Sequence, residues 1–326
     1  MEEVLTKNEI TEQPVVEVKK EKFSYSRMDT YKKCGYQYKI IYVDKKRPPF
    51  GNIATEFGSL MHKAEESIAN CIKENKPIDY ITIKNTFIIK LQKIRYKYPV
   101  EFFTPGKNGM TYYEKAYYYL EYAIYRLEKL MKENPSYELI GAEVDFDYDY
   151  DKLHRFQGSI DRVIRDNATG NYLIYDIKSY DKLMSDDDLT TPLQMVVYTW
   201  AAAQLYNVSQ AQISCHYDLP LMDIYQDGGT KGYMTRGIKK INSLFEGIEN
   251  EDFEPKPSAL CHWCAYCPTN ASSTYEYKYL CPYFSTWEKT GDDVKNVIFS
   301  WNGQDKDNIV KELYADYCLK NATKNV

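Results

Sequence analysis

The strongest pattern of polar and apolar positions lies near the middle of the chain, where two runs of β-forming residues flank a polar turn. Residues 159–165 form the first run, residues 166–170 have the composition of a tight turn, and residues 172–178 form the second run. This spacing predicts a β-hairpin in which Asp161 lies roughly opposite Asp176. The second run is largely apolar, which is typical of a strand that is buried on both faces.

Other segments have the spacing of strands or helices and predict an α/β fold. Residues 137–150 alternate as a strand does, and residues 210–235 predict a strand and a hairpin that turns at Asp227–Gly229. Helical spacing is found in the segments 23–42, 56–74, 79–134 with a break near Pro99–Asn108, 189–207 and 236–250. Together these elements predict a mixed central sheet flanked by helices.

The two ends of the chain differ in composition from its centre. Residues 1–22 are charged and contain no aromatic side chain, which predicts a disordered tail. Residues 23–250 are expected to form one core, into which the helical segment 79–134 is inserted. Residues 251–326 are expected to form a cysteine-rich segment followed by a charged helical tail. The helical segment at the start of the core is expected to form an N-terminal arm, and this arm and the cysteine-rich segment are expected to close over each other.

The two aspartates of the predicted hairpin are unusual residues for a buried sheet. Carboxylates that face each other across a ladder repel, and burial makes such a pair more costly. A bound divalent cation removes that cost, and oxygen ligands suit Mg²⁺. Lys178 shares a face with Asp176, because the side chains of a strand alternate. These features favour a metal site over a surface hairpin with scattered charges.

Charge and composition narrow the classes of function. The formal net charge is −5, so binding of nucleic acid would require a local concentration of lysines and arginines. No apolar run approaches the length of a membrane span, and the first residues lack the pattern of a signal peptide. The sequence contains no G-x4-G-K-S/T phosphate loop. We therefore expect a cytoplasmic protein with no membrane segment and no ATP-driven motor of its own.

The cysteines are expected to bind a metal or a cluster rather than to form disulfides, because the compartment is reducing. Cys261, Cys264 and Cys267 are spaced as C-x2-C-x2-C, and Cys281 follows them. Such a group can converge on one metal ion or one iron–sulfur cluster. Tetrahedral zinc on these four side chains is one interpretation, and it leaves Cys34 as a buried thiol.

Further candidate residues lie on the predicted helices and strands around the hairpin. His62 falls off the apolar stripe of its helix, one turn after Gly58, which favours a ligand role over a structural one. Gln194 and Tyr198 are four residues apart and share a helix face. Glu143 begins the alternating part of its strand. We therefore treat these side chains as candidates for a common site.

The segment 111–133 is rich in tyrosine and in charged residues. One interpretation is a surface on which the bases of single-stranded nucleic acid stack. The other is an amphipathic helix whose tyrosines pack in the core, and it is favoured for most of them.

The hairpin residues resemble a known catalytic motif. Asp161, followed by Asp176-Ile177-Lys178, is similar to the D…(D/E)XK core of the PD-(D/E)XK nucleases. Gly58…His62 and Gln194…Tyr198 are similar to two motifs of the RecB-like branch, which includes the AddB nuclease domain and the CRISPR-associated RecB-like exonucleases. The motifs also follow one another in the order of that branch.

The resemblance implies roles for the hairpin and its neighbours. His62, Asp161 and Asp176 would hold Mg²⁺ or Mn²⁺, with the carbonyl of Ile177 as a further ligand. Lys178 would orient or deprotonate the attacking water and offset charge in the transition state.

Three more residues take their roles from the same resemblance. Glu143 would be an accessory acidic residue of the catalytic site, and Gln194 and Tyr198 would face the DNA.

The resemblance also implies a [4Fe–4S] cluster with one cysteine before the core and three after it. Cys34 is the candidate at the front, and Cys261 and Cys264 are two of the three behind. The third is either Cys267 or Cys281, and Cys281 is preferred because its longer loop lets the segment wrap the cluster.

A metal-dependent DNA nuclease is therefore predicted, acting as an exonuclease on single-stranded or end-containing DNA. DNA repair, recombination or phage DNA metabolism in a bacterial or phage-infected cell is the expected setting, with a separate helicase or recombination protein as partner. The alternative is a catalytically inactive nuclease fold that binds DNA or acts as a scaffold. A third possibility, a zinc-stabilised DNA-binding adaptor, would leave His62 and Lys178 unexplained.

Overall fold

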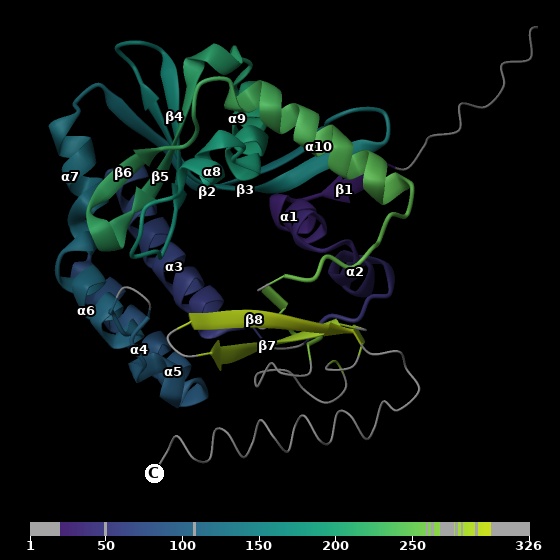
Figure 1. Ribbon diagram of the computed structural model, residues 1–326. Coiled ribbons are helices and arrows are strands. Elements are labelled where there is room, and N and C mark those ends of the chain that lie inside the picture. Colours follow the sequence, from purple (N-terminus) through teal and green to yellow (C-terminus); the bar gives the residue numbers. More distant parts are fainter. Residues whose placement is uncertain are drawn as a thin grey trace, which may run out of the picture.

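A mixed sheet forms the centre of the molecule in the computed structural model (Figure 1). The structure describes residues 20–48, 51–106, 109–258, 260–261, 264–267, 277, 280–281, 283–290 and 293–300. The strands of the central sheet are β1 (Glu21–Phe23), β2 (Tyr137–Asp149), β3 (His154–Asp166), β4 (Asn171–Ile177), β5 (Ile213–Leu219) and β6 (Ile224–Asp227).

The strand order places β3 and β4 in the middle of this sheet. β3 pairs antiparallel with β2 along one edge and antiparallel with β4 along the other. β5 runs parallel to β4, and β6 runs antiparallel to β5. β1 runs parallel to the first residues of β3. The predicted mixed sheet flanked by helices is therefore confirmed.

Helices and short helical turns cover both faces of the sheet. They are α1 (Tyr25–Lys33), α2 (Gly35–Tyr38), η1 (Lys39–Val43), α3 (Ile53–Lys73), α4 (Tyr80–Lys97), α5 (Pro99–Phe103), α6 (Tyr112–Glu121), η2 (Ala123–Tyr125), α7 (Arg126–Glu133), α8 (Asp186–Thr190), α9 (Leu193–Tyr206), η3 (Gln210–Gln212), η4 (Pro220–Met222) and α10 (Tyr233–Glu249). None of the described helices is both long enough and apolar enough to cross a membrane.

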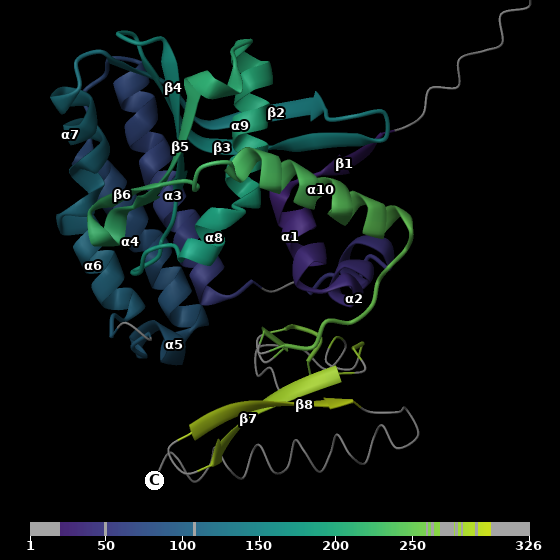
Figure 2. The same ribbon diagram turned by 45° about the horizontal axis from the view of Figure 1, so that its top comes forward.

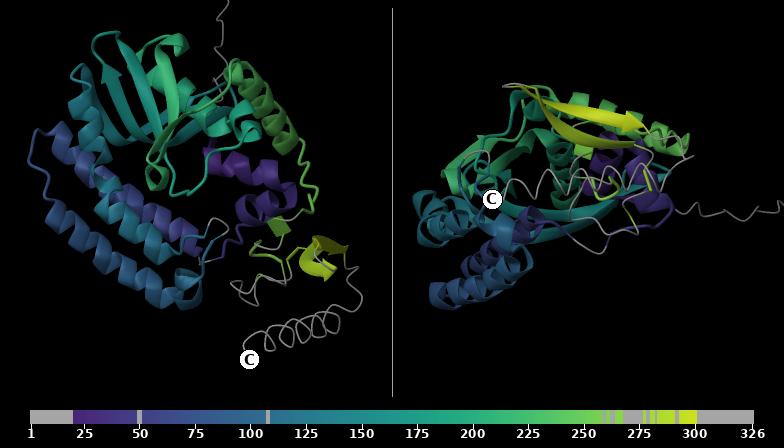
Figure 3. Two further views of the ribbon diagram at one scale, coloured as in Figure 1. Left: turned by 60° about the vertical axis from the view of Figure 1, so that its left-hand side comes forward. Right: turned by 60° about the horizontal axis from the view of Figure 1, so that its bottom comes forward.

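Two apolar layers pack on opposite faces of β4. Ile174 belongs to the layer formed with α1, α9 and α10, whereas its neighbour Tyr175 belongs to the layer formed with α3 to α7. Side chains of adjacent strand residues point to opposite faces, which explains this division. Figure 2 shows α10 and α1 on one side and α4, α6 and α7 on the other. The helices of residues 80–133, coloured blue, also lie together in Figure 3.

Local capping fixes where several of these helices begin. The side chains of Ser24, Asn52 and Asp79 accept hydrogen bonds from the main-chain N–H groups of Arg27, Thr55 and Thr82. Thr111 and Glu114 form a reciprocal capping box at the start of α6. Each cap satisfies an N–H group that has no partner within its own helix. The expected helical segments therefore begin where the sequence provides polar side chains.

The register of the central hairpin matches the one that its turn predicts. Arg162 pairs with Tyr175 in the ladder between β3 and β4. One step further along this register, Asp161 and Asp176 occupy opposing positions. The ladder does not continue to them. Instead, Oδ2 of Asp161 accepts a hydrogen bond of 2.7 Å from the main-chain N–H of Ile177.

The structure corrects three expectations about the outer elements. Glu21 and Lys22, which were expected in a disordered tail, belong to β1, because β3 offers its main chain for pairing; residues 1–19 lie outside the described residues. The hairpin after β5 turns at Pro220–Asp223 instead of Asp227–Gly229, because Asp223 takes a left-handed conformation with φ 57°.

The third correction concerns the expected helical tail. Residues 283–290 and 293–300 form the antiparallel strands β7 (Tyr283–Thr290) and β8 (Asp293–Ser300). Both segments are rich in aromatic and β-branched residues, which favour strands over helices. Residues 301–326, the rest of the expected tail, lie outside the described residues.

Candidate active site

Four elements bring the predicted site residues together at one end of the central hairpin. His62 of α3 directs Nδ1 toward Glu143 of β2, at 3.4 Å from Oε1, and toward Asp161 of β3, at 3.8 Å from Oδ1. Its Nε2 lies 2.8 Å from the carbonyl oxygen of Ile177, the last residue of β4. Residues that are 115 positions apart in the sequence thus contact each other.

Close packing and an unusual backbone conformation position two of these side chains. Gly58, one turn before His62, faces the segment after β4, where an added Cβ would lie 3.3 Å from Ser179 Oγ. Glu143 has φ 47° in the middle of β2, a left-handed conformation that is rare for a residue with a side chain. Such strain is found preferentially at functional sites. We infer that this left-handed conformation serves to direct the Glu143 carboxylate toward His62.

Lys178 connects the hairpin to α9. Its Nζ lies 2.7 Å from Asp176 Oδ2 as an ion pair and donates a hydrogen bond of 2.9 Å to Oε1 of Gln194. The amide of Gln194 in turn donates to the hydroxyl of Tyr198 at 3.0 Å. The Gln194–Tyr198 pair therefore fixes the position of the Lys178 ammonium.

Tyr198 itself lies in the core. Its ring is 5% exposed and packs edge-on against Phe146 at a centroid distance of 6.2 Å. A base cannot stack on the ring in this arrangement. The structure thus links Tyr198 to the site through its hydroxyl and Gln194, which is half-buried.

The charges of the site influence one another strongly. Burial alone would lower the pKa of His62, but the hydrogen bond with Glu143 and the charges of Asp161 and Asp176 outweigh it and raise that pKa to about 9. Burial and the neighbouring Asp176 raise the pKa of Asp161 to about 7. Burial likewise opposes the charge on Lys178, but Asp176 and Asp161 outweigh it and raise the Lys178 pKa. In the metal-free protein, His62 and Lys178 are therefore the cations that balance the carboxylates.

The donor set fits a divalent cation with a preference for oxygen ligands. His62, Glu143 and Asp161 place one ligand atom each within 4.8 Å of the others. Asp176 is 1% exposed and its Oδ2 pairs with Lys178, so this carboxylate is a further candidate ligand whose charge the ammonium balances. Carboxylate and carbonyl oxygens with one imidazole nitrogen suit Mg²⁺ or Mn²⁺. The residues present therefore fit the metal that the sequence predicts.

We expect metal binding at this site to release protons and to strengthen as the pH rises. A metal that takes His62 and Asp161 as ligands must displace their protons, and the pKa values are about 9 and about 7. Affinity should therefore rise through pH 7 and again toward pH 9. Near pH 8 Asp161 is already ionised, so about one proton should leave per ion bound.

Titration calorimetry with Mg²⁺ at pH 8, in buffers of different ionisation enthalpy, measures this release. Glu143→Gln removes the strongest contribution that raises the pKa of His62, so fewer protons should be released by that variant. A binding enthalpy that is independent of the buffer would contradict the assignment of His62 as a ligand.

A buried ionic network, which the sequence did not predict, lies next to the site. Arg162 is 1% exposed and donates to Glu65 of α3 and to Asp218 of β5, both at 2.7 Å. Arg126 of α7 donates to the same Asp218 at 3.0 Å, and the Tyr119 hydroxyl donates to Glu65 at 2.9 Å. The only feature of the sequence that could have indicated this network is that several largely apolar segments each contain a charged residue.

This network joins the elements that carry the site. Glu65 lies one turn after His62 on α3, and Arg162 follows Asp161 on β3. The main-chain N–H of Lys178 donates to the carbonyl oxygen of Asp218 at 2.9 Å. We infer that the network sets the position of α3 relative to the hairpin.

A pocket of about 300 Å³ opens beside His62 and Lys178. The inserted helix α6 contributes Tyr112 and Lys115 to its lining. The Lys115 ammonium lies 3.1 Å from Asp181 Oδ2. The pocket thus combines catalytic candidates with a cation from the helical insertion, which the sequence did not assign to the site.

Four cysteines line a second cavity, away from the catalytic candidates. This cavity has a volume of about 320 Å³, and its lining includes Cys34, Cys261, Cys264 and Cys281. Cys267 is 1% exposed and is not among its lining residues. Tetrahedral zinc would bring its sulfur ligands to about 3.8 Å from one another. Within the part of the chain that the structure describes, no three cysteine sulfurs lie within 4.8 Å of one another.

The segment after α10 returns to the N-terminal helices at this cavity. A Cβ on Gly35 would lie 2.9 Å from the carbonyl oxygen of Asp252, so glycine permits the close approach. The Tyr31 hydroxyl donates to the same oxygen at 2.8 Å. The main-chain N–H of Lys256 points at the Cys34 sulfur, 3.5 Å away. The expected closure of the N-terminal arm over the cysteine segment is therefore present in the structure.

Comparison with known proteins supports the assignment of the fold. Residues 22–271 match the sequence profile of the PD-(D/E)XK nuclease superfamily, and this stretch contains β2 to β6 and all the catalytic candidates. A comparison with curated proteins found no match. The matched stretch is well over half of the chain, and by this match the chain belongs to the PD-(D/E)XK nuclease superfamily.

Proposed function

We propose that this protein is a metal-dependent DNA nuclease of the RecB-like branch, which hydrolyses phosphodiester bonds as an exonuclease. The observation that carries the proposal is the convergence of His62, Glu143 and Asp161 beside the end of β4, where Lys178 stands next to Asp176. A histidine on α3 in this position, together with Gln194 behind the lysine, supports the RecB-like assignment.

The side chains divide the work between metal binding and charge stabilisation. His62, Asp161, Asp176 and the Ile177 carbonyl would hold the ion, with Glu143 as an accessory group. When bound, Mg²⁺ or Mn²⁺ lowers the pKa of a coordinated water and polarises the phosphate.

Lys178 then supplies a fixed positive charge. Its raised pKa makes it an ammonium at neutral pH, which favours orienting the water and offsetting charge over removing a proton. Gln194 holds this ammonium in place through its side-chain oxygen.

The rival function is that of an inactive nuclease fold that binds DNA or acts as a scaffold. A complete set of metal donors with an adjacent lysine argues against it, because a scaffold would not need to keep buried carboxylates such as Asp161 and Asp176 together.

Cleavage of end-labelled DNA in the presence of Mn²⁺ tests the proposed function. Linear and circular molecules, each single- and double-stranded, should be compared. An exonuclease degrades linear substrates from an end and leaves circular ones intact. Absence of cleavage of all four substrates, by protein that binds Mn²⁺, would favour the inactive scaffold.

We further propose that Cys34, Cys261, Cys264 and Cys281 hold a [4Fe–4S] cluster. The cavity that they share supports this cluster, as does the main-chain N–H of Lys256, which points at the Cys34 sulfur. Hydrogen bonds to sulfur contribute to the reduction potential of such clusters. Cys267, which is a ligand in the zinc alternative, is not among the residues that line this cavity.

Anaerobically purified protein should therefore contain iron and acid-labile sulfide and absorb broadly in the visible range. Cys34→Ser should lose the iron and become less stable, because the cluster would join segments more than two hundred residues apart in the sequence. Cys71→Ser on α3 is the matched control and should keep its iron. A colourless wild-type protein with one equivalent of zinc would refute the cluster.

A further inference from the structure

Helix α4 concentrates positive charge in a chain whose net charge is −5. Its 18 residues include no aspartate or glutamate and five cations, which are Lys84, Lys90, Lys93, Arg95 and Lys97. Lys84 and Lys97 pair with Glu121 and Glu56. Lys90 and Lys93 have no ion-pair partner among the described residues, so their charges are available to a polyanion.

Exposed aromatic rings accompany these cations on the neighbouring helices. Tyr96 at the end of α4 is 82% exposed, and Tyr113 and Tyr117 on α6 are 56% and 57% exposed. Phe103 of α5 lies between these helices: the Arg95 guanidinium stands 5.4 Å from the centre of its ring, and Tyr113 lies 6.3 Å from it, centroid to centroid. The rings are therefore interleaved with cations rather than gathered into one apolar patch.

The spacing of the rings on α6 suits a row of bases. Tyr113 and Tyr117 are one turn apart, about 6 Å along the helix axis. Tyr119, by contrast, is fully buried, so α6 separates its tyrosines into a core face and an outer face. The sequence left the role of these tyrosines open, and the structure identifies which of them are accessible.

The first turn of α6 carries both a residue of the catalytic pocket and an exposed ring. Tyr112 and Lys115 line the pocket beside Lys178, and the next residue after Tyr112 is the exposed Tyr113. A strand that leaves the pocket at the first turn of α6 would thus meet the exposed rings.

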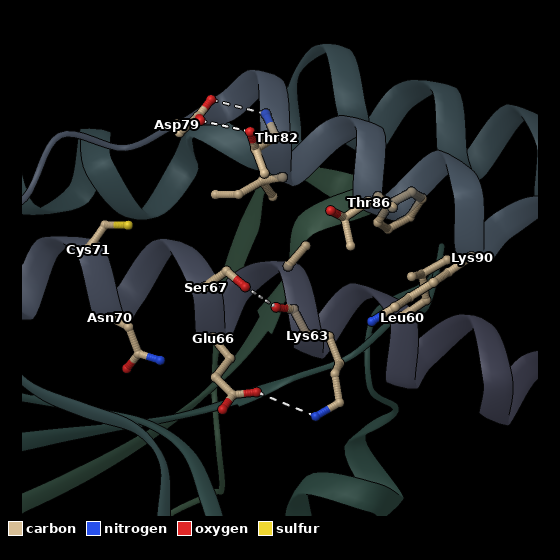
Figure 4. A pocket seen from close by; sticks show the side chains of 13 residues that line it. Leu60, Lys63, Glu66, Ser67, Asn70, Cys71, Asp79, Thr82, Thr86 and Lys90 are labelled. Carbon is tan, nitrogen blue, oxygen red and sulfur yellow. Dashed lines mark hydrogen bonds and ion pairs between the residues drawn. The ribbon is translucent and has the colours of Figure 1, made fainter.

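The flank of α4 that faces α3 also has cations at its edge. A groove of about 430 Å³ separates α4 from α3, and Lys63 and Lys90 are among its lining residues (Figure 4). Lys63 is engaged by Glu66 at 3.7 Å, and Asp79 caps α4. Lys90 is therefore the charge at this edge that is left for a ligand.

We propose that α4, α5 and α6 form a binding surface for single-stranded nucleic acid outside the catalytic pocket, a surface we call the insertion surface. This inference rests on the proposed nuclease function and adds a second place where the substrate is held. Interleaved cations and exposed rings bind a single strand through its phosphates and its bases. A membrane or an acidic protein would not require rings at the spacing of bases.

Binding of a fluorescent oligothymidylate by the full chain, measured by anisotropy in EDTA so that no cleavage occurs, tests the role of the rings. Tyr113→Ala/Tyr117→Ala should weaken binding by about tenfold or more, because the variant loses two rings and each ring contributes its own stacking interaction with a base. Tyr113→Phe/Tyr117→Phe keeps both rings and should bind like the wild type. Equal affinity of the alanine variant and the wild type would overturn the proposal.

The salt dependence of the same binding tests the cations. Lys90→Glu/Lys93→Glu should reduce the slope of log K against log salt by at least about 0.7 for each phosphate that the variant no longer neutralises. Lys239→Glu/Lys240→Glu on α10 makes the same change of charge on exposed positions of another helix and should leave the slope nearly unchanged. Equal slopes for the two variants would contradict the proposal. Loss of binding to phosphatidylserine vesicles, with oligonucleotide binding intact, would assign the surface to membranes instead.

Hydrolysis of a small phosphodiester, bis-p-nitrophenyl phosphate, separates this inference from the proposed function. The surface variants should hydrolyse it at the wild-type rate, because the insertion surface lies outside the pocket. If the wild type does not hydrolyse this ester or DNA, the proposed function fails, while the binding measurements still decide the insertion surface.

Discussion

Replacing Lys178 by alanine is expected to abolish detectable DNA cleavage, with a loss of rate on the order of 10²–10³ or more. The ammonium is the only cationic side chain within ion-pair distance of Asp176 in the described part of the chain, at 2.7 Å. Without it, the fixed positive charge beside Asp176 is lost, and the charge that develops on the phosphate is less well offset. The metal donors remain, so Mn²⁺ binding should persist. Rates on end-labelled DNA and calorimetric Mn²⁺ titrations of one preparation measure both quantities.

Lys182→Ala is the matched control for this experiment. Lys182 lines the same pocket but is exposed and belongs to the loop after β4. Its loss should weaken substrate binding modestly and leave the rate at saturating DNA nearly unchanged. Full activity of Lys178→Ala, or equal loss in the two variants, would refute the assignment of Lys178 to the reacting phosphate.

Arg162→Met is expected to cause the largest loss of stability, about 3–5 kcal/mol in the free energy of unfolding. Arg162 is the shared partner of Glu65 and Asp218, and all three side chains are almost fully buried. Removing the cation leaves Glu65 without its ion-pair partner in the low-dielectric interior, and that is more costly than losing the ion pair itself. Urea unfolding monitored by circular dichroism measures the change.

Arg155→Met provides a control on the same strand. Arg155 makes ion pairs with Asp147 and Asp149 at the surface, so its loss should cost no more than about 1 kcal/mol. Glu65→Gln, added to Arg162→Met, should recover part of the stability because it removes the unpaired negative charge. Equal losses for Arg162→Met and Arg155→Met would show that the network contributes little.

The sequence determined the parts of the molecule whose causes are local. The turn after β3 and the apolar run of β4 set the hairpin register, because a slip of one residue would move every side chain to the other face. The opposition of Asp161 and Asp176 follows from that register alone. Polar caps such as Asn52 likewise determined where helices begin. This is why most of the sheet and the core of the candidate site could be predicted from the sequence.

Only the tertiary structure decided which distant residues meet. Arg162 and Glu65 are separated by 97 positions, and no local pattern predicts that they form an ion pair. Each of them can be buried because the other balances its charge. Glu143 meets His62 across 81 positions, and no local pattern predicts its left-handed conformation within a strand. Tyr113 and Tyr119 have the same chemistry, yet packing of α6 exposes one and buries the other. Burial and long-range pairing are properties of the folded chain, so the sequence predicted the chemistry of the site, whereas the fold decided which residues support it.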